Sequence, residues 1–132
     1  MFTRIVLLAI AAFLGVNGLF MLASPTAWYY GIDSVPATGP LNVHFVRDIG
    51  CAYLAAGVGV LLGALRPAWI VPGGLAAVTF IGGHALVHLW ETVAGHAHGA
   101  PSLVDAAGVY AAPVLLLLVL AAAMRRRLPQ GE

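Results

Sequence analysis

The chain has 132 residues, of which 61% are hydrophobic and only 8% are charged, and its mean hydropathy is +0.97. A water-soluble domain of this size does not tolerate so apolar a composition. The sequence therefore predicts an all-α integral membrane protein, a four-helix bundle that forms one domain over residues 1–132. With a net charge of only +1, the chain lacks the excess of basic residues with which nucleic-acid-binding proteins contact phosphates.

Four apolar runs have the length that a helix needs to cross the hydrocarbon, roughly 17–25 residues. They cover about residues 5–22, 49–65, 68–90 and 106–124. The first run resembles a secretory signal, but it is longer than the core of a signal, and Met21 stands where a small residue is required before cleavage. We therefore expect the first run to be a retained helix.

The arginines indicate the orientation of these helices. Arg4, Arg66 and the run 125–127 all fall on one side if the chain crosses four times. Because basic residues concentrate in cytoplasmic loops, both termini are expected to face the cytoplasm. The absence of lysine beside abundant alanine, glycine, valine and arginine is typical of a GC-rich bacterial genome, so the expected location is a bacterial inner (plasma) membrane.

Polar side chains gather in the outer halves of the predicted helices. In the third helix His84, His88 and Glu91 follow the spacing i, i+4, i+7 and share one face. At 1.5 Å per residue they form a column about 10 Å long. At the outer end of the second helix, His44 and Asp48 share a face by the same i, i+4 rule.

Two further polar residues lie in the same half of the membrane, Arg47 beside Asp48 and Asn17 in the first helix. Strongly polar groups within a bilayer cost several kcal/mol unless they face the bundle and find partners. We therefore expect one outward-facing polar pocket, to which Asn17 and Arg47 contribute as cofactor-binding residues. His96 and His98 belong to the loop after the third helix, where solvated residues are common.

Imidazoles and carboxylates at this spacing suit a first-row transition metal, here iron, copper or zinc. An enzyme would use such a metal as a Lewis acid or as a redox centre. The expected metal ligands are His44, Asp48, His84, His88 and Glu91.

Three alternatives remain open. A b-type haem would use His44 or His84 as an axial ligand, with room provided by the Gly82-Gly83 pair. A quinone or another lipid-soluble ligand would place its polar head among the histidines and carboxylates. Alternatively, the protein is a non-catalytic accessory subunit whose partners are membrane lipid, a second copy or an oxidoreductase subunit.

Short motifs along the chain resemble those of a known family. They are Arg4, Gly18-Leu19-Phe20, Pro25 with Trp28, and Arg47-Asp48-Ile49-Gly50 followed by Gly57. In these motifs and in its layout the chain resembles the DoxX-like group of small four-helix bacterial membrane proteins. Because some members are associated with quinone-linked oxidoreductase systems, the resemblance implies a redox-linked or quinone-facing role. The histidine-rich segment from His84 to His98 has no counterpart in that group's pattern, so no catalytic residue is carried over.

Overall fold

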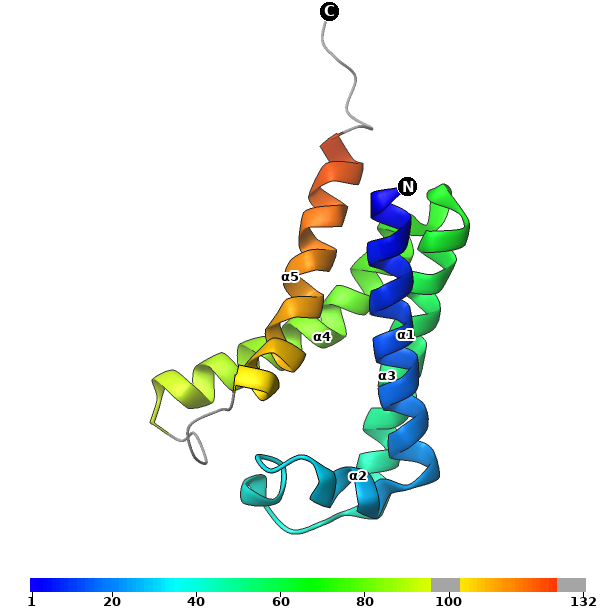
Figure 1. Ribbon diagram of the computed structural model, residues 1–132. Coiled ribbons are helices and arrows are strands. Elements are labelled where there is room, and N and C mark those ends of the chain that lie inside the picture. Colours follow the sequence, from blue (N-terminus) through cyan, green and yellow to red (C-terminus); the bar gives the residue numbers. More distant parts are fainter. Residues whose placement is uncertain (96–102, 126–132) are drawn as a thin grey trace, which may run out of the picture.

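The protein is described by a computed structural model that covers residues 1–95 and 103–125 (Figure 1). Every element in this part of the chain is a helix. Four helices are long and apolar enough to cross a membrane, and they confirm the expected all-α membrane architecture. The elements are α1 Phe2–Ala23, α2 Pro25–Gly31, η1 Pro36–Thr38, α3 Val43–Leu65, η2 Pro67–Trp69, α4 Ile70–Val93 and α5 Leu103–Arg125.

Helix α3 begins at Val43, earlier than the predicted start of the second span at residue 49. Its start is set by Asn42, whose side-chain oxygen accepts a hydrogen bond of 3.0 Å from the backbone N–H of Phe45. The turns before residue 49 contain charged residues, which is why the apolar run does not include them. His44 and Asp48 lie in these turns at the N-terminal end of α3, on the helix where their spacing placed them.

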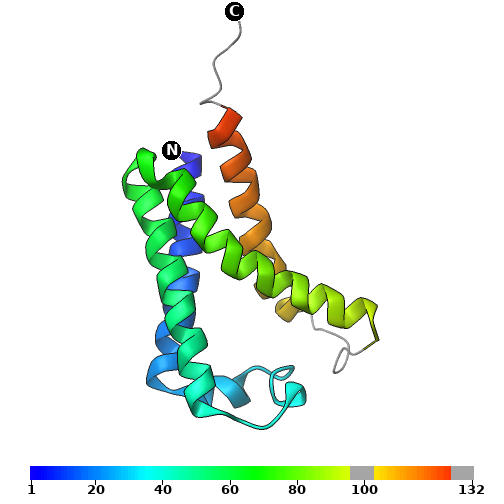
Figure 2. The same cartoon turned by 180° about the vertical axis from the view of Figure 1, so that it is seen from behind.

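Helices α1 and α3 run antiparallel and side by side along most of their length (Figures 1 and 2). Glycines allow this close approach, because a Cβ atom on Gly18 would lie 2.7 Å from the carbonyl oxygen of Gly50. A similar contact joins α3 to α4, where a Cβ atom on Gly59 would lie 2.9 Å from the carbonyl oxygen of Gly73. Below that contact α4 turns away from α3, so the two helices diverge toward the end that carries α2 and η1, which we call the outer end (Figure 2).

The buried core lies where the four long helices converge, toward the end that carries the N-terminus, η2 and the last turns of α5 (Figure 1). Among the residues with described side chains, no polar or charged side chain is buried. The polar side chains among these residues are therefore all at least partly exposed. The core consists of Leu7, Ile10, Ala11, Leu14, Ala56, Val60, Ala64, Ala77, Ile81, Ala112, Leu116 and Leu120.

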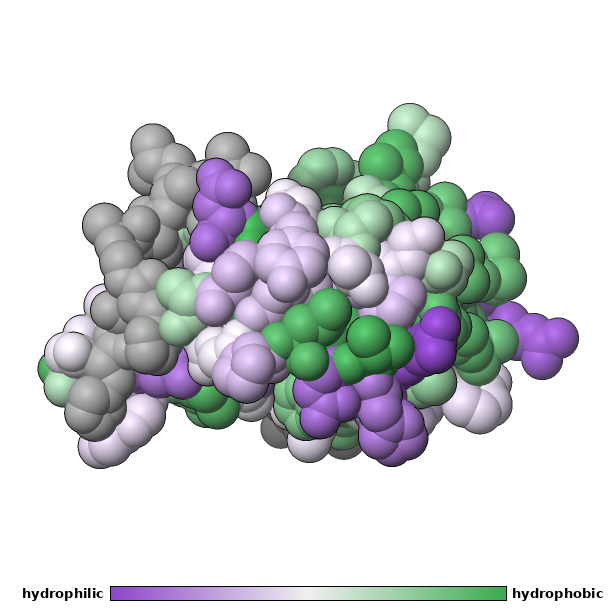
Figure 3. Space-filling model, turned by 90° about the horizontal axis from the view of Figure 1, so that it is seen from below, coloured by the Kyte–Doolittle hydropathy of each residue, from purple (hydrophilic) through white to green (hydrophobic). Residues whose placement is uncertain are grey.

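The segment between α1 and α3, expected as a long loop, contains the short helices α2 and η1. Two side chains of α2 hold it in place: Trp28 Nε1 donates a hydrogen bond of 2.9 Å to Asn17 Oδ1, and the Tyr29 hydroxyl donates to the carbonyl oxygen of Gly39. Seen from below, this end of the molecule shows hydrophilic residues in separate patches among hydrophobic ones (Figure 3). Such a mixture is typical of a membrane–water boundary, where aromatic rings with a polar edge are enriched.

Candidate functional site

The predicted column on α4 begins with two histidines in direct contact. The imidazole rings of His84 and His88 have centroids 4.6 Å apart and meet edge to face at 83°. Both side chains are half-buried, and so is Glu91 on the following turn. The i, i+4 spacing brings the two rings together because one helical turn separates them. Four ring nitrogens are thus presented on one stretch of a membrane-spanning helix.

Two aromatic residues border this pair on the side that faces α3. The ring of Tyr53, on α3, lies 5.0 Å from the ring of Phe80 and 6.3 Å from the imidazole of His84, measured between centroids. The sequence analysis did not single out Tyr53, because it followed histidines, carboxylates, arginine and asparagine only. A tyrosine near the middle of a predicted span was the signal that could have identified it.

The polar atoms of this cluster lack partners within the part of the chain that the structure describes. The side chains of His84, His88 and Tyr53 make ring contacts but no hydrogen bond to any described residue. The Glu91 side chain likewise makes no hydrogen bond or ion pair there. All four side chains are only partly buried, and none of their nitrogen or oxygen atoms is fully enclosed without a partner. Their polar atoms are therefore accessible from outside the helices.

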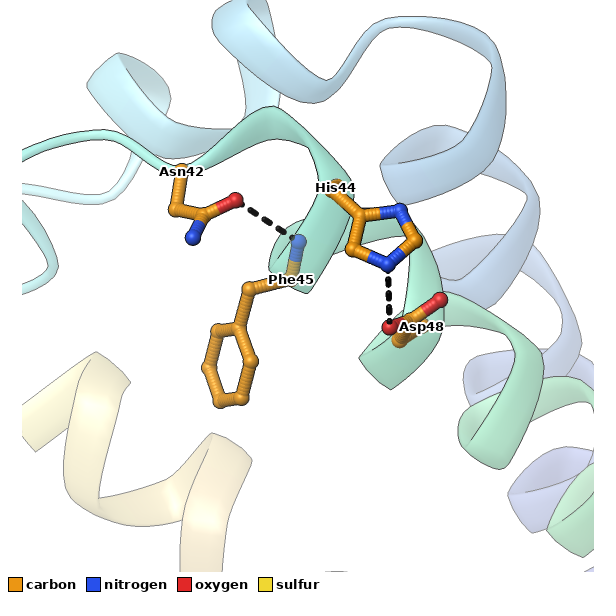
Figure 4. A network of polar contacts seen from close by, with 4 residues as sticks. All are labelled: Asn42, His44, Phe45 and Asp48. Carbon is orange, nitrogen blue, oxygen red and sulfur yellow. Dashed lines mark hydrogen bonds and ion pairs between the residues drawn. The ribbon is translucent and has the colours of Figure 1, made fainter.

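The second predicted group of ligands lies at the outer end of α3. His44 Nε2 and Asp48 Oδ2 are 3.3 Å apart (Figure 4), and their side chains are 87% and 61% exposed. Because α3 and α4 diverge toward this end, the structure does not bring this pair to the α4 column (Figures 1 and 2). In residues 1–95 and 106–125, whose side chains the structure describes, no group of three or more histidines, cysteines or carboxylates is close enough to surround a metal ion. A shared site that contains all five ligands remains a prediction.

The two predicted cofactor-binding residues both have partners inside the protein. Asn17 accepts the hydrogen bond from Trp28, and its amide nitrogen lies 3.9 Å from Met21 Sδ. Arg47 is exposed, and its Nε donates a long hydrogen bond of 3.4 Å to the carbonyl oxygen of Leu22. Each residue thus contributes to packing at the outer end of α1. His96 and His98 lie outside the described residues.

A separate groove of about 200 Å³ lies between α1 and α5. It has no side chain that could bind a metal or donate a hydrogen bond, and both of its walls belong to membrane-spanning helices. Its apolar lining offers no group to the polar site. Its lining residues are Ala9, Ile10, Phe13, Ala107, Gly108, Ala111, Ala112 and Leu115.

Comparison with known proteins finds no matching family model, no matching curated protein and no matching solved structure. The resemblance to DoxX-like proteins therefore rests on the short motifs alone. The chemistry of the site has to be argued from the residues themselves. Two adjacent imidazoles, with a carboxylate on the next turn and a phenol on the neighbouring helix, are the polar groups that this stretch of the membrane-spanning helices offers to a ligand.

Proposed function

We propose that the protein binds one transition-metal ion, iron, copper or zinc, through His84 and His88, with Glu91 as the third ligand. The observation that carries the proposal is the contact between two imidazoles that have no hydrogen-bond partner in the described chain. Two histidines at i, i+4 on one helical face are a recurring way to hold a metal ion. A carboxylate on the next turn extends the same face.

The proposal keeps His44 and Asp48 as ligands that α3 would add. In the present arrangement they contact each other at the outer surface. They would reach the α4 ligands only if the outer halves of α3 and α4 moved closer together. No metal contact is assigned to Asn17 or Arg47. Involvement in redox chemistry rests on the DoxX-like motifs and would require iron or copper rather than zinc.

One observation favours a second candidate, a lipid-soluble ligand with a polar ring such as a quinone. The aromatic rings of Tyr53 and Phe80 lie beside His84, within membrane-spanning helices that such a ligand reaches through the lipid. Carbonyl oxygens on the ligand would accept hydrogen bonds from the phenol and an imidazole. This candidate needs no metal, so a measurement of metal binding distinguishes the two proposals.

The test is a calorimetric titration of the purified protein with Zn²⁺ in a mild detergent. The wild type should bind one ion per chain. His84→Ala and His88→Ala should each weaken binding by at least about tenfold, because each removes a ligand from the metal's first coordination shell. His98→Ala, which removes a loop histidine, is the matched control and should bind as the wild type does.

A separate outcome decides the contribution of α3. If His44→Ala also weakens binding, the metal site includes both helices, whereas unchanged binding restricts it to the α4 side. Equal affinity in the wild type, His84→Ala and His88→Ala would contradict the metal proposal altogether and favour the quinone-like ligand.

We also propose that both termini face the cytoplasm and that the membrane is a bacterial inner membrane. In support, the N-terminus, the η2 turn and the end of α5 lie at one end of the molecule (Figure 1). That end carries Arg4, Arg66 and Arg125. Because basic residues are enriched in cytoplasmic loops, these arginines favour a cytoplasmic location for it. The α4 ligands would then open toward the outer leaflet.

A further inference from the structure

The apolar groove between α1 and α5 offers open space beside two membrane-spanning helices. Its volume is about 200 Å³, and a Cβ atom added to Gly108, on its α5 wall, would meet no neighbouring atom within 4 Å. Alanine and glycine make up most of its lining, so the two walls leave room between them. A space with an apolar lining does not hold ordered water, because water needs polar partners. The groove therefore suits an apolar chain.

One face of α5 leads from this groove to a cation. Ala111, Leu118 and Arg125 follow one another at intervals of seven residues, so the three positions lie close to one face of the helix. Arg125 is ten residues beyond Leu115 of the groove, a distance of about 15 Å along the helix. The hydrocarbon of one leaflet is also about 15 Å deep, half of the roughly 30 Å of a bilayer. A lipid with its headgroup at Arg125 therefore extends its acyl chain to the groove.

The charge at this end of α5 favours an anionic headgroup. Arg125 is exposed, and its side chain makes no hydrogen bond or ion pair with any described residue. The carboxylates whose side chains the structure describes are Asp33, Asp48 and Glu91. They belong to the segment after α2, the start of α3 and the end of α4, which all lie away from this end (Figures 1 and 2). A lipid phosphate would supply the opposite charge that these carboxylates do not.

We propose that the groove binds one acyl chain of an anionic phospholipid whose phosphate pairs with Arg125. The lipid belongs to the leaflet on the side of the N-terminus. A second copy of the chain fits less well, because a two-fold contact of equally oriented copies across this groove would bring their Arg125 side chains toward each other. Like charges brought together in this way repel. The inference is independent of the metal proposal, because the groove and the α4 histidines share no residue.

The first test measures lipid selectivity by native mass spectrometry of the purified full-length protein, incubated in mild detergent with phosphatidylglycerol or phosphatidylcholine. The wild type should retain one phosphatidylglycerol per chain and bind it about fivefold more tightly than phosphatidylcholine, which has no net charge. Arg125→Gln should lose this preference. Arg66→Gln, which removes an arginine of the same end that is not on α5, is the matched control and should keep it.

The second test fills the groove. Gly108→Leu and Gly15→Leu add the same side chain to helical glycines at which an added Cβ atom meets no neighbour within 4 Å, but only Gly108 lines the groove. Gly108→Leu should weaken phosphatidylglycerol binding by about tenfold, the effect of removing about two methylene groups from apolar contact. Gly15→Leu should bind the lipid as the wild type does. Far-ultraviolet circular dichroism confirms that both variants keep their helices.

The outcomes that overturn the inference are distinct. Equal binding of the two lipids by the wild type, or equal loss of selectivity in Arg66→Gln and Arg125→Gln, would show that Arg125 does not select the headgroup. Equal lipid binding by Gly108→Leu and the wild type would show that the chain does not enter the groove. A wild-type mass of two chains that is absent in Gly108→Leu would assign the groove to a second copy instead.

Discussion

At the scale of single residues, the polar side chains of the membrane-spanning helices fall into two kinds. Asn17 has a partner, because Trp28 donates to its side-chain oxygen. The side chains of His84 and His88 contact each other, but neither makes a hydrogen bond to a described residue. Asn17 therefore serves the packing of α2 on α1. The two histidines have no such partner, and for this reason we propose that the ligand binds on α4.

The hydrogen bond between Trp28 and Asn17 is expected to stabilise the protein modestly. Trp28→Phe should lower the free energy of unfolding by about 1 kcal/mol, since hydrogen bonds in membrane proteins average about 0.6 kcal/mol and some packing is also lost. In an Asn17→Leu background the same substitution should cost clearly less, because the bond is already absent. Reversible unfolding in mixed micelles measures all four proteins.

Trp90→Phe serves as the control for this pair, because the Trp90 side chain is 67% exposed and makes no hydrogen bond to any described residue. It should change the free energy of unfolding little. Equal costs for Trp28→Phe in the two backgrounds would show that the hydrogen bond contributes nothing.

Some of the site was predictable from the sequence at this scale. The contact between His84 and His88 follows from helical periodicity alone, because both residues belong to one helix and their spacing fixes their relation. The contact of Tyr53 with His84 depends on how α3 packs against α4, which no spacing along the chain reveals. The sequence therefore did not predict that Tyr53 lies beside the histidines, because this depends on the tertiary packing of two helices.

At the scale of elements, the relation between α3 and α4 positions the site. The two backbones touch where Gly59 faces Gly73, and they diverge beyond that point. Tyr53 and Phe80 lie on the diverging side and still contact each other. The glycine contact therefore determines how far the tyrosine on α3 stands from the histidines on α4.

Gly73→Ala should destabilise the protein by about 1–3 kcal/mol, the usual cost of forcing extra volume into a packed contact. The added methyl group would collide with the carbonyl oxygen of Gly59, which is backbone and cannot rotate away. Gly15→Ala is the matched control, because nothing lies within 4 Å of the added methyl group. It should stabilise α1 by roughly 0.5–1 kcal/mol, since alanine loses less backbone entropy in a helix.

The measurement is the free energy of unfolding of both alanine variants in the same micelles. If Gly73→Ala were as stable as the wild type, the close contact of α3 with α4 would be wrong. The structural basis for placing Tyr53 beside His84 would then be lost.

Element boundaries show where sequence reasoning succeeded and where it did not. The four spans were recognised because long apolar runs have few interpretations. The apolar run of the second span begins at about residue 49, but the helical spacing of His44 and Asp48 already placed both residues on that helix, as the start of α3 at Val43 has them. The cap by Asn42 is local chemistry that a hydropathy average does not register.

At the scale of the whole molecule, the helices converge at one end and separate at the other. The buried core belongs to the converging part and is entirely apolar among the described side chains. The separation of α4 from α3 follows from three-dimensional packing, which the spacing of residues along the chain does not predict. A single pocket that joins the His44–Asp48 pair to the α4 histidines therefore stays a prediction. Large apolar side chains such as Phe13 and Leu118 are exposed on the outside, as contact with lipid requires.

The orientation of the molecule can be tested with single cysteines. In a Cys51→Ser background, Ala37→Cys in η1 should react in intact bacterial cells with a maleimide that does not cross membranes. Thr3→Cys, near the N-terminus, should react only after the cells are opened, because basic residues keep its end in the cytoplasm. The reverse pattern would contradict the proposed orientation, and equal labelling of both would contradict a single orientation.

The central claim is that His84 and His88 hold a metal ion. Elemental analysis of the protein purified in mild detergent, without a metal-binding tag and after incubation with Zn²⁺ and dialysis, tests it most directly. The wild type should retain close to one metal ion per chain, and His88→Ala prepared in parallel should retain almost none. Equal metal content in the two proteins, or none in either, would contradict the account.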